Sequence, residues 1–294
     1  MTGSNGALRI ALCGGRLSAL LAEPVEPPPR ATILALHGAG MSAGYFDAQA
    51  MPDLSLCTLA AEHGYRVVAV DRPGYGGSAA GFPNGQALAD QVRTVRRVLR
   101  EVTEHVDPGA GVLLLGHSFG GKVALGVAAE EPGLLGADVS GCGHRYAPAE
   151  VPLDGSARMM RHSWGPLRHY PPGTFQRCGS IVGPVPTLEL REARRWPGVF
   201  DDVVPRIRVP VRFTFADHES WWRHDPAALA ELRSRPVRSP LVLVCRQADA
   251  GHNISLGLTA RDYHLGVLGF LRMCLDVRAA SGHHSQTSTK GLVT

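Results

Sequence analysis

No run of about 18 consecutive apolar residues occurs in this 294-residue sequence, although hydrophobic residues make up 44% of it. A membrane-spanning helix needs an unbroken apolar segment of that length, so we expect no membrane span. The first residues also lack a basic start followed by an apolar run, so we expect no secretory signal. These absences favour a globular protein of the cytoplasm.

Paired cysteines and basic clusters are missing as well. None of the six cysteines belongs to a C-x-x-C pair, which argues against a disulfide framework or a zinc site and favours reduced thiols. Lysine occurs only at positions 122 and 290, and the arginines that supply the remaining positive charge are dispersed. With a formal net charge of +4, the chain lacks the basic stripe typical of proteins that bind nucleic acid.

Short aliphatic segments alternate with helical patterns along most of the chain. The expected strands are 31–38, 65–74, 111–118, 136–141, 209–216 and 240–246, and the expected helices are 53–63, 85–105, 119–131 and 262–278. Aliphatic strands joined by helices predict an α/β fold with a mostly parallel central sheet flanked by helices. Residues 7–24 alternate around Gly14 and Gly15, which predicts an antiparallel hairpin at the sheet edge.

Two segments depart from this alternation. Residues 144–204 are rich in Pro, Arg, His and aromatic side chains and contain no expected strand, which predicts an insertion over the sheet. Residues 279–294 are polar and aperiodic, which predicts a disordered tail. We therefore expect residues 1–294 to form a single domain that carries a lid or cap at 144–204.

A serine flanked by glycines follows the expected strand 111–118. Gly116, Ser118 and Gly120 form a G-x-S-x-G motif that leads directly into the helical pattern at 119–131. In a nucleophile elbow, this order of strand, turn and helix holds the serine in a strained backbone conformation, and glycines avoid collisions with the neighbouring elements. The serine hydroxyl then lies at the carboxyl edge of the sheet. The alternative is a serine that only caps the following helix.

This elbow and three further segments resemble those of the α/β-hydrolase-fold serine hydrolases, from residue 8 to residue 278. LALHGAG at 34–40 resembles the His-Gly loop of that family, and VDRPGYGGS at 70–78 resembles a loop that packs near the elbow. The resemblance implies an oxyanion hole formed by the backbone N–H groups of Ala39 and Phe119. It also implies that His37 braces its loop.

The third segment, ADAGHNISL at 248–256, places His252 where the family carries its general base. Two residues are candidates for the acid that orients this histidine. In the family the carboxylate usually stands three residues after the small residue that ends its strand, and with Ala216 in that place the match is Glu219. Asp217 is the alternate acid and fits if the strand ends earlier. We expect Ser118, His252 and Glu219 to form the catalytic triad.

The resemblance implies hydrolysis of a carboxylic ester or thioester through an acyl-enzyme intermediate, with no metal and no organic cofactor. Three alternatives stay open: a thioesterase that acts on acyl groups of a carrier protein, a biosynthetic enzyme that eliminates an acyl group from a specialised metabolite, and a ligand-binding relative without turnover. The last usually lacks a triad member, whereas candidates for all three are present here. The sequence leaves the oligomeric state open.

Several aromatic residues could line an acyl pocket for a small-molecule substrate, although aromatics of an inserted element more often form its own packing core. The candidates are Trp164, Tyr170, Trp196, Trp221 and Trp222. Arg191, Arg194 and Arg195 stand at helical spacing. They could attract an anionic substrate or the phosphopantetheine arm of a carrier protein, or form a solvated helix face.

Overall fold

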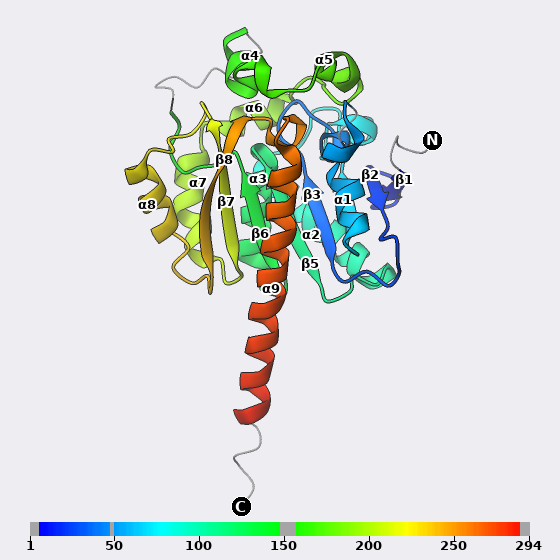
Figure 1. The fold of residues 1–294 in the computed structure, drawn as a ribbon, viewed down its shortest axis with the longest axis vertical. Helices are drawn as coiled ribbons and strands as arrows, with labels where there is room; N and C mark the ends of the chain where they lie inside the picture. The colour runs from blue at the N-terminus through cyan, green and yellow to red at the C-terminus, as the bar shows by residue number, and fades with distance from the viewer. Residues whose placement is uncertain (1–5, 48–49, 148–156, 289–294) are drawn as a thin grey trace, which may run out of the picture.

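The computed structural model describes residues 6–47, 50–147 and 157–288. An eight-stranded sheet runs through these residues, with helices on both of its faces (Figure 1). The strands are β1 (Leu8–Leu12), β2 (Leu17–Ala22), β3 (Thr32–Leu36), β4 (Arg66–Val70), β5 (Val112–His117), β6 (Gly136–Ser140), β7 (Val211–His218) and β8 (Val242–Gly251). The α-helices are α1 (Leu56–Glu62), α2 (Leu88–His105), α3 (Phe119–Glu130), α4 (Ala157–Trp164), α5 (Thr174–Arg177), α6 (Thr187–Ala193), α7 (Trp196–Val203), α8 (Pro226–Ser234) and α9 (Ala260–Ser288).

The strands are arranged in the order β1-β2-β4-β3-β5-β6-β7-β8. β1 and β2 form an antiparallel hairpin, and β2 also pairs antiparallel with β4. The remaining neighbours pair parallel. This topology confirms the predicted fold class and the hairpin at the sheet edge. Because the parallel strands share one direction, their carboxyl ends meet at the same edge, where the loops of open α/β sheets bind ligands.

Alternate residues of the central strands face two separate apolar layers. In β3, Leu34 and Leu36 pack with residues of α2, α3 and α7, whereas Ile33 and Ala35 pack with residues of α1 and α9. Every residue of β3, β4 and β5 is buried, as expected for parallel strands covered on both faces. Burial of this aliphatic surface stabilises the sheet and so fixes the positions of its strand ends.

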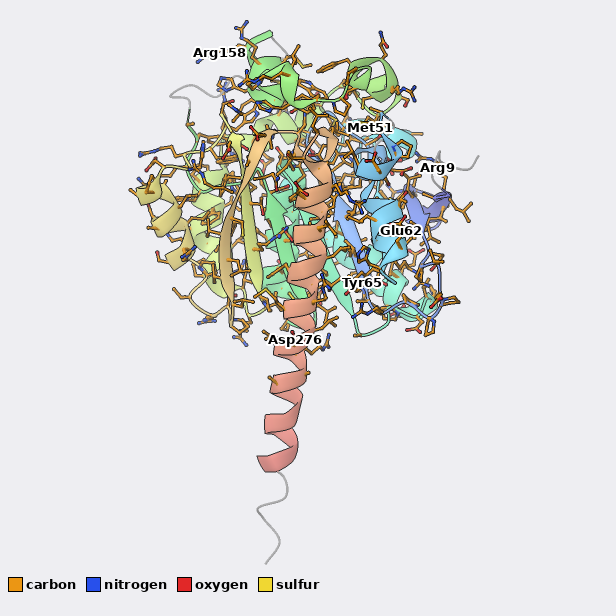
Figure 2. The ribbon with its side chains drawn as sticks, viewed as in Figure 1. Arg9, Met51, Glu62, Tyr65, Arg158 and Asp276 are labelled. Carbon is orange, nitrogen blue, oxygen red and sulfur yellow. The ribbon has the colours of Figure 1, made fainter. Side chains whose placement is uncertain are left out.

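The described chain between β6 and β7, where the sequence predicts an insertion over residues 144–204, contains helices and no strand. Part of that range, 148–156, lies outside the described residues. α4 and α5 lie beyond the carboxyl edge of the sheet (Figure 1). Arg158 on α4 lies near one end of the globular body, and Asp276 on α9 lies at the opposite side of that body, beyond which α9 continues (Figure 2). α4 and α5 therefore stand over the edge at which Ser118 is placed.

Some element boundaries differ from the sequence-based expectations. β7 extends past Ala216 to His218, with an irregular register between these two residues. α9 continues to Ser288, whereas the sequence predicts a disordered tail from residue 279; residues 289–294 lie outside the described part. Once a helix is formed, each further residue adds a hydrogen bond at a small entropic cost, and Ala279 and Ala280 favour the helix. α8 was not among the expected helices; its N-cap Asp225 accepts a hydrogen bond from the backbone N–H of Ala228.

Candidate active site

Ser118 occupies a sharp turn between β5 and α3. Its backbone has φ 53° and ψ −115°, a conformation that side chains rarely adopt. A Cβ atom on Gly120 would lie 2.1 Å from the carbonyl oxygen of Leu36, and one on Gly116 would lie 2.6 Å from the carbonyl oxygen of Gly120. Both glycines are therefore required by backbone that approaches from β3 and α3. The predicted strand, turn and helix are present at this position.

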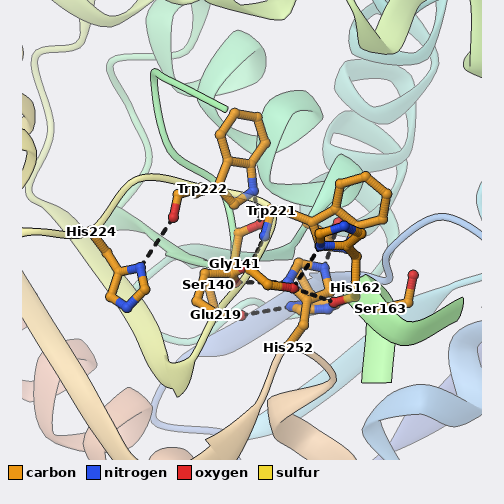
Figure 3. A network of polar contacts seen from close by, with 12 residues as sticks. Ser140, Gly141, His162, Ser163, Glu219, Trp221, Trp222, His224 and His252 are labelled. Carbon is orange, nitrogen blue, oxygen red and sulfur yellow. Dashed lines mark hydrogen bonds and ion pairs between the residues drawn. The ribbon is translucent and has the colours of Figure 1, made fainter. Parts of the chain in front are cut away.

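His252 lies between Ser118 and Glu219, and Figure 3 shows its contact with Glu219. Its Nε2 atom is 3.1 Å from Oγ of Ser118, and its Nδ1 atom is 2.7 Å from Oε2 of Glu219. Because a carboxylate only accepts hydrogen bonds, Nδ1 carries the proton and Nε2 is left as an acceptor for the serine hydroxyl. The structure thus brings together the three residues that sequence reasoning selected, which directly follow β5, β7 and β8.

Glu219, and not Asp217, contacts the imidazole. Glu219 follows the last residue of β7, and its carboxylate is fully buried. Its second oxygen, Oε1, accepts a hydrogen bond of 2.8 Å from the backbone N–H of Trp221. Asp217 is exposed within β7, where successive side chains point to opposite sides of the strand. The irregular register between Ala216 and His218 changes the direction in which the following side chains point, so that the carboxylate of Glu219 reaches His252.

Two backbone N–H groups lie beside the serine at the cavity. Ala39 and Phe119 both line it, and among the described residues neither N–H donates a hydrogen bond to the protein. Gly38 gives the loop its close approach, because a Cβ atom there would lie 2.9 Å from Cδ2 of His117 and 3.1 Å from Cβ of Ser118. Two unpaired donors near one hydroxyl are the arrangement that stabilises an oxyanion.

His37 braces the loop that carries Ala39. Its Nδ1 atom lies 2.8 Å from the carbonyl oxygen of Gly38, and its Nε2 atom accepts a hydrogen bond from the backbone N–H of Arg72. Burial holds the pKa of His37 well below its ordinary value, so the imidazole is neutral. A neutral ring with both nitrogen atoms engaged supports the loop and is unsuited to accept the serine proton.

The cavity above Ser118 is small, about 60 Å³. It is lined by Gly38, Ala39, His117, Ser118, Phe119, Lys122, Tyr146, Met159, Ser163, Ala193, Trp221, Trp222, His252 and Asn253. Trp221 and Trp222 were expected here. Met159 and Ser163 come from α4 and Ala193 from α6, so the inserted helices form part of the wall.

The other three aromatic candidates do not line this cavity, which corrects the prediction for them. Trp164 and Tyr170 pack edge to face at 5.1 Å, and Oη of Tyr170 donates to the carbonyl oxygen of Trp164. Trp196 is fully buried and donates from Nε1 to the carbonyl oxygen of Gly143. All three rings belong to apolar clusters that also contain residues of the sheet and its flanking helices. They therefore pack the inserted segment against the body of the protein.

Sequence reasoning missed Lys122 and Tyr146 as cavity residues. Lys122 stands four residues after Ser118 on α3, and its N–H donates to the carbonyl oxygen of Ser118 at 3.3 Å. One helical turn brings two side chains to the same face. That spacing, together with the scarcity of lysine in the chain, could have identified Lys122 as a cavity residue from the sequence. Tyr146 had none, because its ring reaches the cavity by stacking on Trp222 at 4.2 Å.

Within residues 6–47, 50–147 and 157–288, no cluster of His, Cys, Asp and Glu side chains is suited to hold a metal ion. In the same part of the chain, no helix combines the length and the apolar character needed to cross a bilayer.

The model of the Alpha/beta hydrolase family matches residues 33–288. Over 151 residues the chain is 30% identical to the "Putative non-heme haloperoxidase" of Mycobacterium phage D29, covering 51% of this chain and 45% of that protein. Over 111 residues it is 35% identical to monoglyceride lipase of Homo sapiens, covering 36% of this chain and 32% of that protein. The matched region thus spans less than half the length of either curated relative.

A solved structure extends this likeness to nearly the whole chain. The monoacylglycerol lipase of Paleococcus ferrophilus superposes with a TM-score of 0.66 and 17% identity, covering 88% of this chain and 99% of that one. At this identity the likeness concerns the fold.

Proposed function

The chain belongs to the alpha/beta hydrolase family, and from that premise we propose that it is a serine hydrolase of carboxylic esters or thioesters. The observation that carries the proposal is the pair of contacts made by His252, 3.1 Å to Oγ of Ser118 and 2.7 Å to the carboxylate of Glu219. They join a serine on a strained turn to a base that a buried carboxylate orients. The lipases among the relatives and solved structures are in keeping with this chemistry.

The proposed reaction proceeds in two halves. Oγ of Ser118 attacks the acyl carbon while Nε2 of His252 takes the hydroxyl proton, and that proton then passes to the leaving alcohol or thiol. A water molecule next attacks the acyl-enzyme, with His252 again accepting and returning the proton, which releases the acid and restores Ser118. Glu219 stabilises the imidazolium that forms in each half. The N–H groups of Ala39 and Phe119 would stabilise the oxyanion, a contribution of about 3 kcal/mol or more.

We also propose that the segment between β6 and β7 acts as a lid, as expected for residues 144–204. Met159 and Ser163 on α4 and Ala193 on α6 contribute to the wall of the cavity. The cavity of about 60 Å³ holds a few water molecules. An ester with a longer acyl or alcohol group would therefore enter only after α4 moves away from Ser118.

The test is a panel of p-nitrophenyl esters of graded acyl length, run beside acyl thioesters and followed by labelling with a fluorophosphonate probe. We expect turnover of at least one class and covalent labelling of the wild type, because an activated serine reacts with both. Ser118→Ala should lose turnover and labelling without a change in thermal unfolding.

Ser234→Ala is the matched control, because Ser234 is an exposed serine on α8. This variant should behave as the wild type. Labelling that persists in Ser118→Ala would place the nucleophile on another residue. A folded wild type that neither turns over nor labels would contradict the proposed function and favour a ligand-binding relative.

A further inference from the structure

Lys122 is a cation buried beside the candidate nucleophile. Its side chain lines the same cavity as Ser118, and the residue is 4% exposed. Among the described residues no carboxylate lies within ion-pair distance of its ammonium group. The charge of Glu189 acts on Lys122 from a longer distance and raises its pKa, but the ion pair of Glu189 is with Arg72. A buried charge without a counterion is unfavourable unless a ligand or other groups compensate it.

The hydrogen bonds of the ammonium group leave part of its donor capacity unused. Nζ donates to Oη of Tyr146 at 2.8 Å and, at the longer distance of 3.4 Å, to the carbonyl oxygen of Ala193. Tyr146 itself donates to that same carbonyl at 2.5 Å, so its proton is directed away from the lysine. An ammonium group has three N–H donors, and the third has no acceptor among the described residues.

Aromatic rings surround the ammonium group on its other sides. Nζ lies 5.1 Å from the ring centre of Phe119, 5.4 Å from those of Tyr146 and Trp222, and 5.7 Å from that of Trp196. Aromatic faces attract a cation but accept no strong hydrogen bond. Burial lowers the pKa of Lys122 to about 8, which leaves the group mostly protonated at neutral pH. The rings therefore stabilise a positive charge at this position, and the same lysine lines the cavity of Ser118, where a ligand can meet that charge.

We propose that Lys122 binds a free carboxylate of the substrate, so that the preferred esters are those that also carry an anionic carboxylate a few bonds from the scissile carbonyl. The inference rests on the proposed function and specifies its substrate class. Ser118 and Lys122 are one helical turn apart and face the same cavity, so a short molecule can reach both. A charge-assisted hydrogen bond to an ammonium group excluded from water is strong enough to select such a substrate.

The competing explanation is that Lys122 is structural and that its cation–π contacts and two hydrogen bonds suffice. The two explanations differ in one readout. If Lys122 is structural, its replacement changes kcat/KM for all esters by the same factor. If Lys122 binds a carboxylate, its replacement lowers kcat/KM selectively for the anionic ester. The ratio of kcat/KM for an anionic ester to that for its neutral counterpart separates them, because losses of folding or of triad geometry cancel in that ratio.

The experiment compares monoethyl glutarate with the neutral ethyl ester in which an isopropyl group replaces the free carboxylate. A second pair, the acetate ester of a short hydroxy acid and its uncharged counterpart, places the carboxylate in the alcohol part. We expect the wild type to prefer the anionic member of at least one pair. In Lys122→Met, which keeps the side-chain length and removes the charge, the ratio should fall about tenfold or more.

Arg100→Met is the control for a general loss of positive charge, because Arg100 is an exposed cation on α2. Its ratio should match that of the wild type. The thermal unfolding of Lys122→Met should not fall below that of the wild type, since Met suits a cavity of aromatic rings. An unchanged ratio in Lys122→Met, or a wild type that prefers the neutral esters, would overturn the proposal.

A binding measurement separates this proposal from the proposed function. Ser118→Ala cannot turn over substrate, so calorimetric titration with monoethyl glutarate reports binding alone. Affinity that is lost in Ser118→Ala combined with Lys122→Met supports the carboxylate site even if the wild type hydrolyses no ester. Equal affinity, or equal absence of affinity, in the two proteins would show that Lys122 does not hold a carboxylate.

Discussion

The guanidinium group of Arg72 and the carboxylate of Glu189 form an ion pair of 2.6 Å in the interior of the protein, although the two residues lie 117 positions apart. Arg72 follows β4, and Glu189 belongs to α6 of the inserted segment. Glu189 also accepts hydrogen bonds from Tyr75 and Gln91. Arg72 in turn donates from Nε to the carbonyl oxygen of His37. The pair therefore ties the inserted segment to the loop that carries one of the proposed oxyanion donors.

Replacing one partner of this pair should be strongly destabilising. Glu189→Gln leaves the guanidinium of Arg72 buried without its counter-charge, and removal of one member of a buried pair costs about 3 kcal/mol or more. The free energy of unfolding in urea measures the effect. Glu192→Gln on the same helix breaks a pair with the exposed Arg195, and its loss should stay below about 1 kcal/mol. Equal losses in the two variants would contradict a stabilising role for the buried pair.

The two carboxylates near the end of β7 should differ sharply in their effect on catalysis. Glu219→Gln replaces the acceptor of the His252 Nδ1–H bond by an amide, which no longer stabilises the charged imidazole. We expect kcat to fall by several orders of magnitude, as with the roughly ten-thousandfold loss for an acid-to-amide change in such triads. Asp217→Asn, a change at an exposed side chain, serves as the control and should keep the activity of the wild type. The reverse ranking would assign the acid to Asp217.

Gly120→Ala should prevent the elbow from forming. The added Cβ would meet the carbonyl oxygens of Leu36 and His37 at 2.1 Å and 2.5 Å, and both belong to backbone that cannot yield without displacing β3 or its loop. We expect little folded protein in thermal unfolding scans. Gly269→Ala is the matched control, because its Cβ would have no neighbour within 4 Å and α9 continues through it. That variant should gain up to about 1 kcal/mol in stability, whereas a stable Gly120→Ala would refute the steric argument.

The preference for anionic esters proposed for Lys122 should disappear at alkaline pH. Burial lowers the pKa of this lysine from 10.5 to about 8, so the ammonium group loses its proton as the pH rises through about 8. Two other ionisable groups near it keep their protons in this range, because burial raises the pKa of Cys142 to about 12 and also raises that of Tyr146. Glu189 forms its ion pair with Arg72. The ratio of kcat/KM values for the ester pair should therefore decline between pH 7 and pH 9 in the wild type and stay flat in Lys122→Met. A flat wild-type ratio would contradict this assignment.

The same pKa shift predicts the sign of a stability difference. Between pH 8 and 10.5 the unfolded chain binds the Lys122 proton and the folded chain does not, so the free energy of unfolding contributed by this group rises with pH in that window. Lys122→Met lacks the contribution. Urea unfolding at pH 7.5 and at pH 10 should show the advantage of Lys122→Met over the wild type shrinking as the pH increases. An advantage that grows with pH would reverse the sign and exclude a depressed pKa.

Short-range sequence patterns determined the elements and the backbone of the elbow. The aliphatic segment before Gly116 predicted a buried strand, and the G-x-S-x-G spacing predicted a sharp turn into a helix, because hydrophobic periodicity and turn residues are properties of neighbouring positions in the chain. The hairpin around Gly14 and Gly15 and the parallel strands followed from the same local rules. The position of His252 came from chain order and from resemblance.

Contacts between distant segments were decided by the tertiary structure alone. The sequence did not distinguish whether the aromatic residues of the inserted segment line a pocket or form a packing core. In the structure, Trp164, Tyr170 and Trp196 are buried in the core because the inserted segment packs against the body of the protein. Lys122 and Glu189 carry ordinary helix-surface side chains in the sequence. Lys122 becomes a buried cation because aromatic rings from four separate segments pack around its ammonium group. Glu189 becomes a buried ion-pair partner because Arg72, from the loop after β4, contacts its carboxylate. Burial and charge pairing depend on packing over long sequence separations, which local propensity does not encode.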